Sequence, residues 1–174
     1  MSPLDKKRFS IASSTYPCGN SNLDGLSLDI YFYGCQKHCK NCHNPELWEF
    51  QSPNVSFNDL EKVVNKAENA EIITLLGGDV IDSLGENSLH LLLYWLVTHF
   101  DKKICLYTYR SFDKIPKNIL SYLDYIKTGE YDETKKTKAG SFLASSNQVM
   151  WKKELNKWRV QWKYDKNSDT NISL

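Results

Sequence analysis

The sequence has almost no excess of charge of either sign. Its 174 residues include 22 Lys and Arg against 21 Asp and Glu, which gives a formal net charge of +1. A strongly basic or acidic balance would point to nucleic acid or a membrane surface as the main partner, and its absence argues against both. We therefore expect neither a nucleic-acid partner nor a membrane partner.

Long apolar runs are also missing. The longest, residues 89–97, contains His90 and falls well short of the roughly 20 residues that cross a bilayer. Residues 1–8 are charged and no apolar segment follows them, so we expect no secretory leader. Together these absences predict a cytoplasmic protein.

The five cysteines do not form a pattern that predicts disulfides. In the cytoplasm, cysteines are metal ligands or free thiols much more often than they form disulfides. Cys105 lies in an apolar stretch, which predicts a small buried core residue. Cys18 stands alone and is interpreted as a loop thiol.

Alternating apolar segments predict an α/β fold. The length suits one domain with a substantial core. Ser56 followed by Asp59 is a helix-capping pattern, and a one-sided apolar stripe follows it. Strands are expected at residues 28–33, 72–76, 104–109 and 124–127, and the further helices at residues 88–100 and 116–123. The connections are long enough for right-handed crossovers, so the sheet should be largely parallel.

Three segments whose residues could bind a ligand or take part in a reaction each follow an expected strand. They are residues 34–42, 77–79 and 108–110. In parallel sheets, ligands bind beyond the carboxyl ends of the strands. The topology therefore predicts that these three segments meet at one edge of the sheet.

Three cysteines, Cys35, Cys39 and Cys42, have C-x3-C-x2-C spacing on one of these loops. Three thiolates can hold three irons of a [4Fe–4S] cluster and leave the fourth iron open to another ligand. The alternative is a zinc site completed by His38 or His43. Zinc ligands usually come from two separated segments, whereas all of these candidates crowd one loop.

Two glycines, Gly77 and Gly78, end the strand at residues 72–76. Glycines there let the backbone turn sharply and approach a ligand closely. Taken alone, the pair is more typical of an ordinary strand-to-loop turn.

The cysteine spacing and the glycine turn together resemble the radical S-adenosylmethionine (SAM) enzymes. In that family the backbone of the glycine turn engages the methionyl amino group of SAM. The family commonly has Glu and Pro where this chain has Asp79 and Val80.

Further motifs resemble one branch, the activating proteins of anaerobic (class III) ribonucleotide reductase. Residues 39–48 (CKNCHNPELW) are similar to its C-x2-C-aromatic-Asn-x3-Trp segment. Residues 107–112 resemble its Tyr-Thr-Gly-Tyr-Thr strand end, and residues 124–131 its Asp-x3-Asp-Gly-x-Phe element with Thr128 in place of the second acid. Residues 144–148 (ASSNQ) are similar to its Gly-Ser-Ser-Asn-Gln motif.

The resemblance implies a single-domain partial (β/α) barrel of radical SAM type over residues 1–164, followed by a polar, frayed tail over residues 165–174. Its cofactors would be a [4Fe–4S] cluster and SAM. The implied cluster ligands, which are also the catalytic residues, are Cys35, Cys39 and Cys42. The implied SAM-binding residues are Gly77, Gly78, Asp79, His43, Asn44, Thr108 and Asn147.

The implied reaction is reductive cleavage of SAM, followed by removal of a hydrogen from a glycine of a partner protein. That partner would be the C-terminal glycyl loop of the anaerobic reductase large subunit, with a flavodoxin- or ferredoxin-type electron donor. Three alternatives stay open. They are an activase of another glycyl-radical enzyme such as pyruvate formate-lyase, a radical SAM enzyme for a small molecule, and a zinc-bound interaction module that uses the aromatic segment 151–166.

Overall fold

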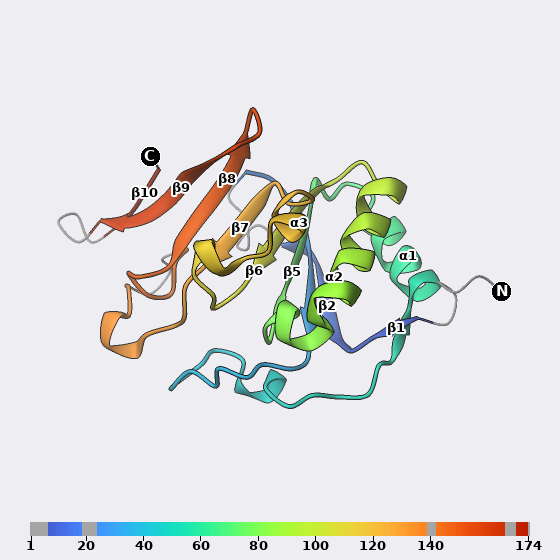
Figure 1. Cartoon of the computed structure of the whole chain (residues 1–174), viewed down its shortest axis with the longest axis horizontal. Coiled ribbons are helices and arrows are strands. Elements are labelled where there is room, and N and C mark those ends of the chain that lie inside the picture. The colour runs from blue at the N-terminus through green and yellow to red at the C-terminus, as the bar shows by residue number, and fades with distance from the viewer. Residues whose placement is uncertain (1–6, 19–23, 139–141, 166–169, 174) are drawn as a thin grey trace.

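The computed structural model describes residues 7–18, 24–138, 142–165 and 170–173, which fold into an eight-stranded sheet with helices packed on it (Figure 1). Across the sheet the order is β10-β9-β8-β7-β6-β5-β3-β2. Its strands are β2 (Ile11–Cys18), β3 (Ser27–Phe32), β5 (Ile72–Gly77), β6 (Lys103–Tyr107), β7 (Tyr125–Thr128), β8 (Val149–Glu154), β9 (Lys157–Asp165) and β10 (Thr170–Ser173). A separate two-stranded sheet pairs β1 (Arg8–Phe9) with β4 (Val55–Ser56).

The centre of the large sheet is parallel. Strands β3, β5, β6 and β7 run in the same direction, as the strand and helix pattern predicted. On either side the sheet continues with antiparallel strands, β2 on one edge and β8, β9 and β10 on the other. These outer strands were not among the predicted ones.

The C-terminal segment corrects one expectation. The polar tail was expected to be frayed from residue 165 onward. That was wrong for Thr170–Ser173, which forms β10 and pairs antiparallel with β9. The boundary between an activase domain and a tail at residue 164 stays a prediction.

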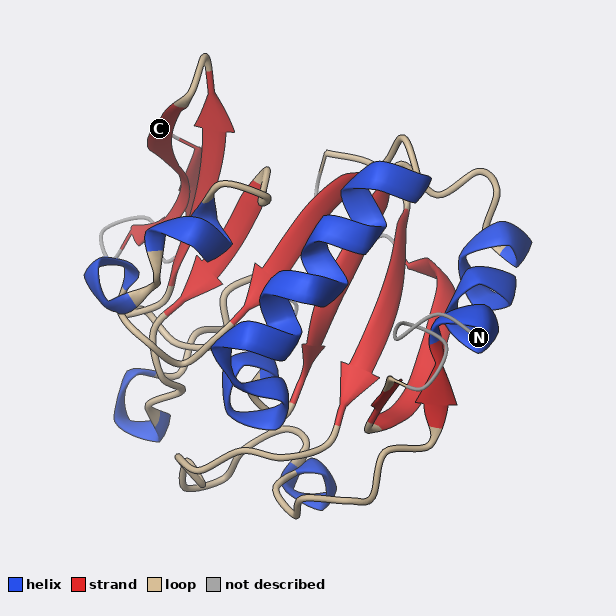
Figure 2. Ribbon diagram, turned by 45° about the vertical axis from the view of Figure 1, so that its right-hand side comes forward, coloured by secondary structure: helices blue, strands red, loops and turns tan. Residues whose placement is uncertain are grey.

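The helices that connect the parallel strands lie on one face of the sheet (Figure 2). They are α1 (Phe57–Lys66), α2 (Val80–His99) and α3 (Lys117–Leu120). The predicted capping box at the start of α1 is confirmed, because the Ser56 hydroxyl accepts from the backbone N–H of Asp59 and the Asp59 carboxylate accepts from that of Ser56. The described residues also form short 3-10 helices, η2 (Pro45–Leu47), η3 (Phe112–Lys114) and η4 (Glu133–Lys135).

Helix α2 begins eight residues earlier than predicted. The apolar pattern placed its start at residue 88, but Asp79 caps it and the helix begins at Val80. Gly85, at φ 68°, kinks the helix between its two parts. The expected helix is therefore the second part, which carries the buried leucines.

The larger core lies between the helices and the sheet, and a smaller core covers the opposite face. Cys105 is fully buried in the smaller core, as predicted. Trp151 and Trp158, from the aromatic segment, pack against Phe112 with ring centroids 4.5 and 5.6 Å away. This packing matches the interpretation in which the segment docks its aromatic rings on the domain.

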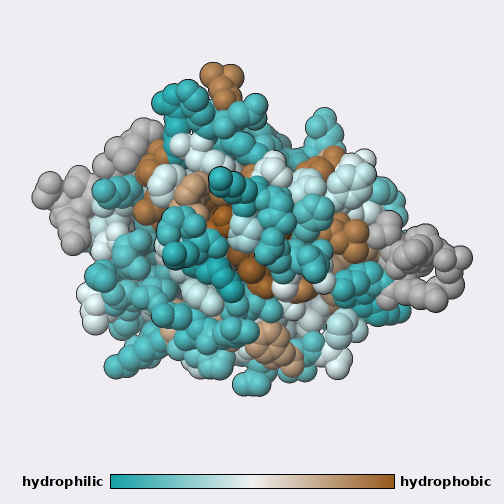
Figure 3. All heavy atoms as spheres, viewed as in Figure 1, coloured by the Kyte–Doolittle hydropathy of each residue, from teal (hydrophilic) through white to brown (hydrophobic). Residues whose placement is uncertain are grey.

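The surface seen in Figure 3 is mostly hydrophilic, with apolar residues exposed in separate small groups. Among the residues that the structure describes, no helix is long and apolar enough to cross a membrane.

Candidate metal and cofactor site

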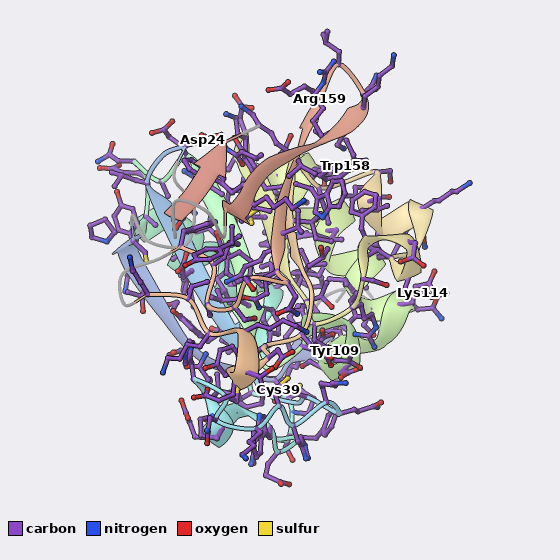
Figure 4. The ribbon with its side chains drawn as sticks, turned by 90° about the vertical axis from the view of Figure 1, so that its left-hand side faces the viewer. Asp24, Cys39, Tyr109, Lys114, Trp158 and Arg159 are labelled. Atoms are coloured by element: carbon purple, nitrogen blue, oxygen red, sulfur yellow. The ribbon has the colours of Figure 1, made fainter. Side chains whose placement is uncertain are left out.

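The loops that follow β3, β5 and β6 meet at one edge of the sheet, as the topology predicted, and the loop that follows β7 lies there too. They surround a cavity of about 150 Å³. Figure 4 shows Cys39 and Tyr109 together at this end of the molecule, far from Asp24 and Arg159. The cavity is lined by Cys35, Cys39, Cys42, Asn44, Trp48, Leu76, Gly77, Gly78, Tyr107, Thr108, Tyr109, Lys127, Gly129, Tyr131 and Gln148.

The cysteine loop folds back on its own C-terminal end. The backbone N–H of Gly34 donates to the carbonyl of Leu47 over 2.8 Å, and that of Cys35 donates to the carbonyl of Trp48 over 2.9 Å. The His38 ring stacks on Trp48 with centroids 4.8 Å apart. These contacts fix the loop across the cavity before any ligand is present.

All three cysteines of the motif line the cavity, with Cys35 buried and the other two partly exposed. Burial raises the pKa of the Cys35 thiol, although backbone hydrogen bonds from Lys37 and His38 oppose the shift. Burial also raises the pKa of Cys39, and the charges of Cys42 and Cys35 add to it. Three thiolates here repel one another, so a positively charged group among them would stabilise their ionised form.

The donor set fits a [4Fe–4S] cluster better than a single zinc ion. Each iron of a cluster takes one thiolate, so three thiols can be spread along a cavity wall. A zinc ion needs four ligands around one centre. Within the described ranges, no three Cys, His, Asp or Glu side chains gather tightly enough to hold one metal ion.

The glycine turn is packed directly against the start of the cysteine loop. The backbone N–H of Gly78 donates to the Phe32 carbonyl over 2.8 Å, and that of Asp79 donates to the Gly34 carbonyl over 2.9 Å. A Cβ on Gly78 would lie 2.4 Å from the Gly34 oxygen, and one on Gly77 would lie 2.6 Å from the Phe32 nitrogen. The two glycines are thus required for the backbones to meet, in addition to lining the cavity.

Asp79 is fully buried and does not line the cavity. Its Oδ1 accepts from the backbone N–H groups of Ile81 and Asp82, at 3.0 and 3.1 Å. Its Oδ2 accepts from the Thr108 hydroxyl at 2.5 Å and from the Tyr109 N–H at 3.2 Å. Both oxygens are therefore occupied, and this geometry argues against the predicted contact between the Asp79 side chain and SAM.

Arg110 completes this buried cluster. Its guanidinium forms ion pairs with Asp79 and, at 2.5 Å, with Asp82. Asp82 also accepts from the backbone N–H of Gln36, inside the cysteine loop, over 2.8 Å. The pairs connect the end of β6 to the start of α2 and to the cysteine loop.

The remaining predicted residues separate into two groups. Asn44 and Thr108 line the cavity. His43 does not; its ring lies 5.0 Å from that of Tyr131. Asn147 also lies outside the lining, and its Nδ2 donates to the Glu130 carbonyl over 2.8 Å.

Sequence reasoning missed two polar lining residues on the β7 side of the cavity, Lys127 and Gln148. Gln148 is the neighbour of Asn147, and its amide donates to the Gly129 carbonyl over 3.1 Å. Lys127 lies near the carboxyl end of β7, so the rule that ligands bind beyond the strand ends could have identified it.

We expect Gly78→Ala to destabilise the protein by about 1–3 kcal/mol, because the new Cβ would overlap the Gly34 backbone. Gly25→Ala is the matched control, since its Cβ would meet only the movable carboxylate end of Glu71 at 3.0 Å. Chemical denaturation of both variants measures the difference. Equal stability of the two variants would contradict the close packing of the turn.

We expect Arg110→Met to cost about 3–5 kcal/mol, because it leaves two buried carboxylates without their partner. Arg159→Met is the control, because the Arg159 side chain is 69% exposed and lies 3.9 Å from Glu154, a geometry that contributes about 0–1 kcal/mol. The free energies of unfolding of the two variants provide the comparison. A loss below about 1 kcal/mol for Arg110→Met would rule out the proposed cluster.

Comparison with known proteins agrees with this geometry. The chain is 27% identical over 149 residues to the anaerobic ribonucleoside-triphosphate reductase-activating protein of Enterobacteria phage T4, covering 83% of this chain and 95% of that protein. It is 24% identical over 152 residues to the protein of the same name from Pasteurella multocida (strain Pm70), covering 79% of this chain and 94% of that one. The predicted resemblance to these activating proteins is therefore confirmed.

A family model described as a 4Fe-4S single cluster domain matches residues 22–151. That range contains the three cysteines of the motif, the glycine turn and the strands that position them. Because the match covers most of the chain, the protein belongs to the family of 4Fe-4S single cluster domains.

Proposed function

We propose that this protein is a radical SAM activase that generates a glycyl radical on an anaerobic ribonucleotide reductase. The observation that carries the proposal is the cavity in which Cys35, Cys39 and Cys42 face the Gly77–Gly78 turn. The open, eight-stranded sheet with its parallel centre fits the partial (β/α) barrel that this function implies.

Each part of the cavity has a role in this proposal. The three cysteines hold a [4Fe–4S] cluster and leave one iron for SAM. When bound, the two cofactors supply a one-electron cleavage of the sulfonium, whose radical product can take a hydrogen atom from a glycine. The chain itself binds and orients: Gly77 and Gly78 present backbone groups, while Asn44 and Thr108 offer side-chain hydrogen bonds to SAM.

His43 and Asn147 take supporting positions in this scheme. His43 contacts Tyr131, which does line the cavity. Asn147 holds the carbonyl of Glu130 and thereby the segment that follows β7. The two residues therefore shape the β7 side of the cavity in which SAM would bind.

The choice of partner is supported by the printed names of the two relatives, both activating proteins of anaerobic ribonucleoside-triphosphate reductases. Neither of these two names mentions pyruvate formate-lyase. The electron would come from a flavodoxin- or ferredoxin-type donor, and the glycine from the C-terminal loop of the reductase large subunit.

We expect the anaerobically reconstituted protein to bind about four irons per chain and to convert SAM to 5′-deoxyadenosine under reduction. Cys39→Ala should lose both properties, because one iron loses its ligand. Cys105→Ala is the matched control, because Cys105 lies in the smaller core, away from the cavity, and both properties should persist. Iron analysis and chromatography measure the outcome, and a zinc-loaded wild type without iron would contradict the proposal.

The partner assignment has a separate test. Mixed with SAM, a reductant and the anaerobic reductase large subunit, the protein should produce an electron paramagnetic resonance signal of a glycyl radical. Replacement of the acceptor glycine by alanine in the reductase should remove that signal. A radical on pyruvate formate-lyase and none on the reductase would contradict the assignment.

A further inference from the structure

A lysine lines the cavity together with the thiols and the glycine turn. Among the residues that line it, Lys127 is the one basic side chain. It is near the end of β7, beside Tyr107 of β6 in the parallel register. Its Nζ lies 4.8 Å from the centre of the Tyr107 ring and 5.7 Å from that of Phe142.

Two other cations at this edge of the sheet are already paired. Arg110 binds Asp79 and Asp82, and Lys37 of the cysteine loop binds Glu130. In the part of the chain that the structure describes, no carboxylate forms an ion pair with Lys127. It is therefore the one lining residue whose positive charge is left for a ligand.

The surroundings of Lys127 make an unpaired charge costly. The rings of Tyr107 and Phe142 replace part of the water around the ammonium, which costs hydration free energy. The two cation–π contacts recover part of that hydration free energy. Burial lowers the pKa of Lys127 to about 8, so the side chain is mostly charged at neutral pH. An anion bound in the cavity would restore the interactions that the ammonium gives up.

We infer that the Lys127 ammonium binds the carboxylate of SAM and thereby selects a carboxylated sulfonium over a decarboxylated one. This inference rests on the proposed function. The carboxylate is the single anionic group of SAM, whereas its sulfonium is positive and its adenosine is neutral.

The position of Lys127 suits this role. The glycine turn ends β5, and Lys127 is on β7, two strands away, which corresponds to about 10 Å across the sheet. Thr108, which follows β6, lines the cavity between them. A lysine has a flexible four-carbon stem, so its ammonium can reach an amino-acid headgroup whose amino end lies at the turn.

A different role for the same charge would be to offset the negative charge of a cluster held by three thiolates. That role would affect all ligands of the loaded protein alike. The carboxylate role affects only ligands that carry a carboxylate. The two can therefore be separated by comparing two ligands that differ in this one group.

The test is equilibrium binding of SAM and of decarboxylated SAM to the cluster-loaded protein, with Lys127→Met and Lys127→Arg as variants. Lys127→Met should weaken SAM binding roughly tenfold to a hundredfold, the range of a lost hydrogen bond to a charged group. It should leave the affinity for decarboxylated SAM within about twofold. Lys127→Arg keeps the charge and should keep the preference for SAM.

Lys103→Met is the matched control. Lys103 lies over the Tyr125 ring at 5.8 Å, at the opposite end of β6 and outside the cavity lining. The Lys103→Met substitution should change neither the affinity for SAM nor the affinity for decarboxylated SAM. Iron content and the unfolding midpoint establish that each variant is folded. If Lys127→Met fails this check, Lys127→Gln replaces it as the uncharged variant in the binding comparison.

An equal loss of affinity for both ligands in Lys127→Met, or no loss for either, would overturn the role of Lys127 while leaving the proposed function intact. A wild-type protein that binds no cluster or no SAM would instead overturn the proposed function, and this inference with it. The two failures are thus distinct.

Discussion

The buried carboxylate of Asp79 is the interaction on which the rest of the site depends. It caps α2 through Ile81 and Asp82, and it accepts from Thr108 and Tyr109 at the end of β6. In a low-dielectric interior such a group is tolerated only when its oxygens are satisfied, and here the Arg110 guanidinium completes the set. Because the preceding glycines contact the cysteine loop directly, this one carboxylate helps to position the glycine turn, the end of β6 and the cysteine loop relative to one another.

Each wall of that cavity offers a different chemistry. The cysteine loop offers three thiols, the glycine turn offers backbone groups, and β7 offers one cation next to aromatic rings. A ligand that carries a sulfonium, an amino group and a carboxylate, and that also binds a metal cluster, can satisfy all three walls at once. This match between walls and ligand groups is a stronger argument than any one motif.

Much of the fold and the placement of the thiols could be predicted from the sequence. Apolar strands, the Ser56 capping box and the cysteine spacing are local patterns, and the parallel-sheet rule then brings their ends together. The pairing of β8 with β7 joins strands separated by residues 129–148, and no local pattern in the sequence predicts which strand β8 pairs with. The role of Asp79 could not be predicted either, because its partners Thr108 and Arg110 lie 29 and 31 residues away.

The central claim is that the three cysteines and the glycine turn form one site in which SAM contacts the cluster. Electron–nuclear double resonance on the reduced, SAM-bound protein tests this directly, with SAM labelled by ¹⁵N at its amino group. The account predicts a hyperfine coupling between that nitrogen and the cluster, which disappears when unlabelled methionine replaces labelled SAM. A cluster signal with no coupling to bound, labelled SAM would contradict it.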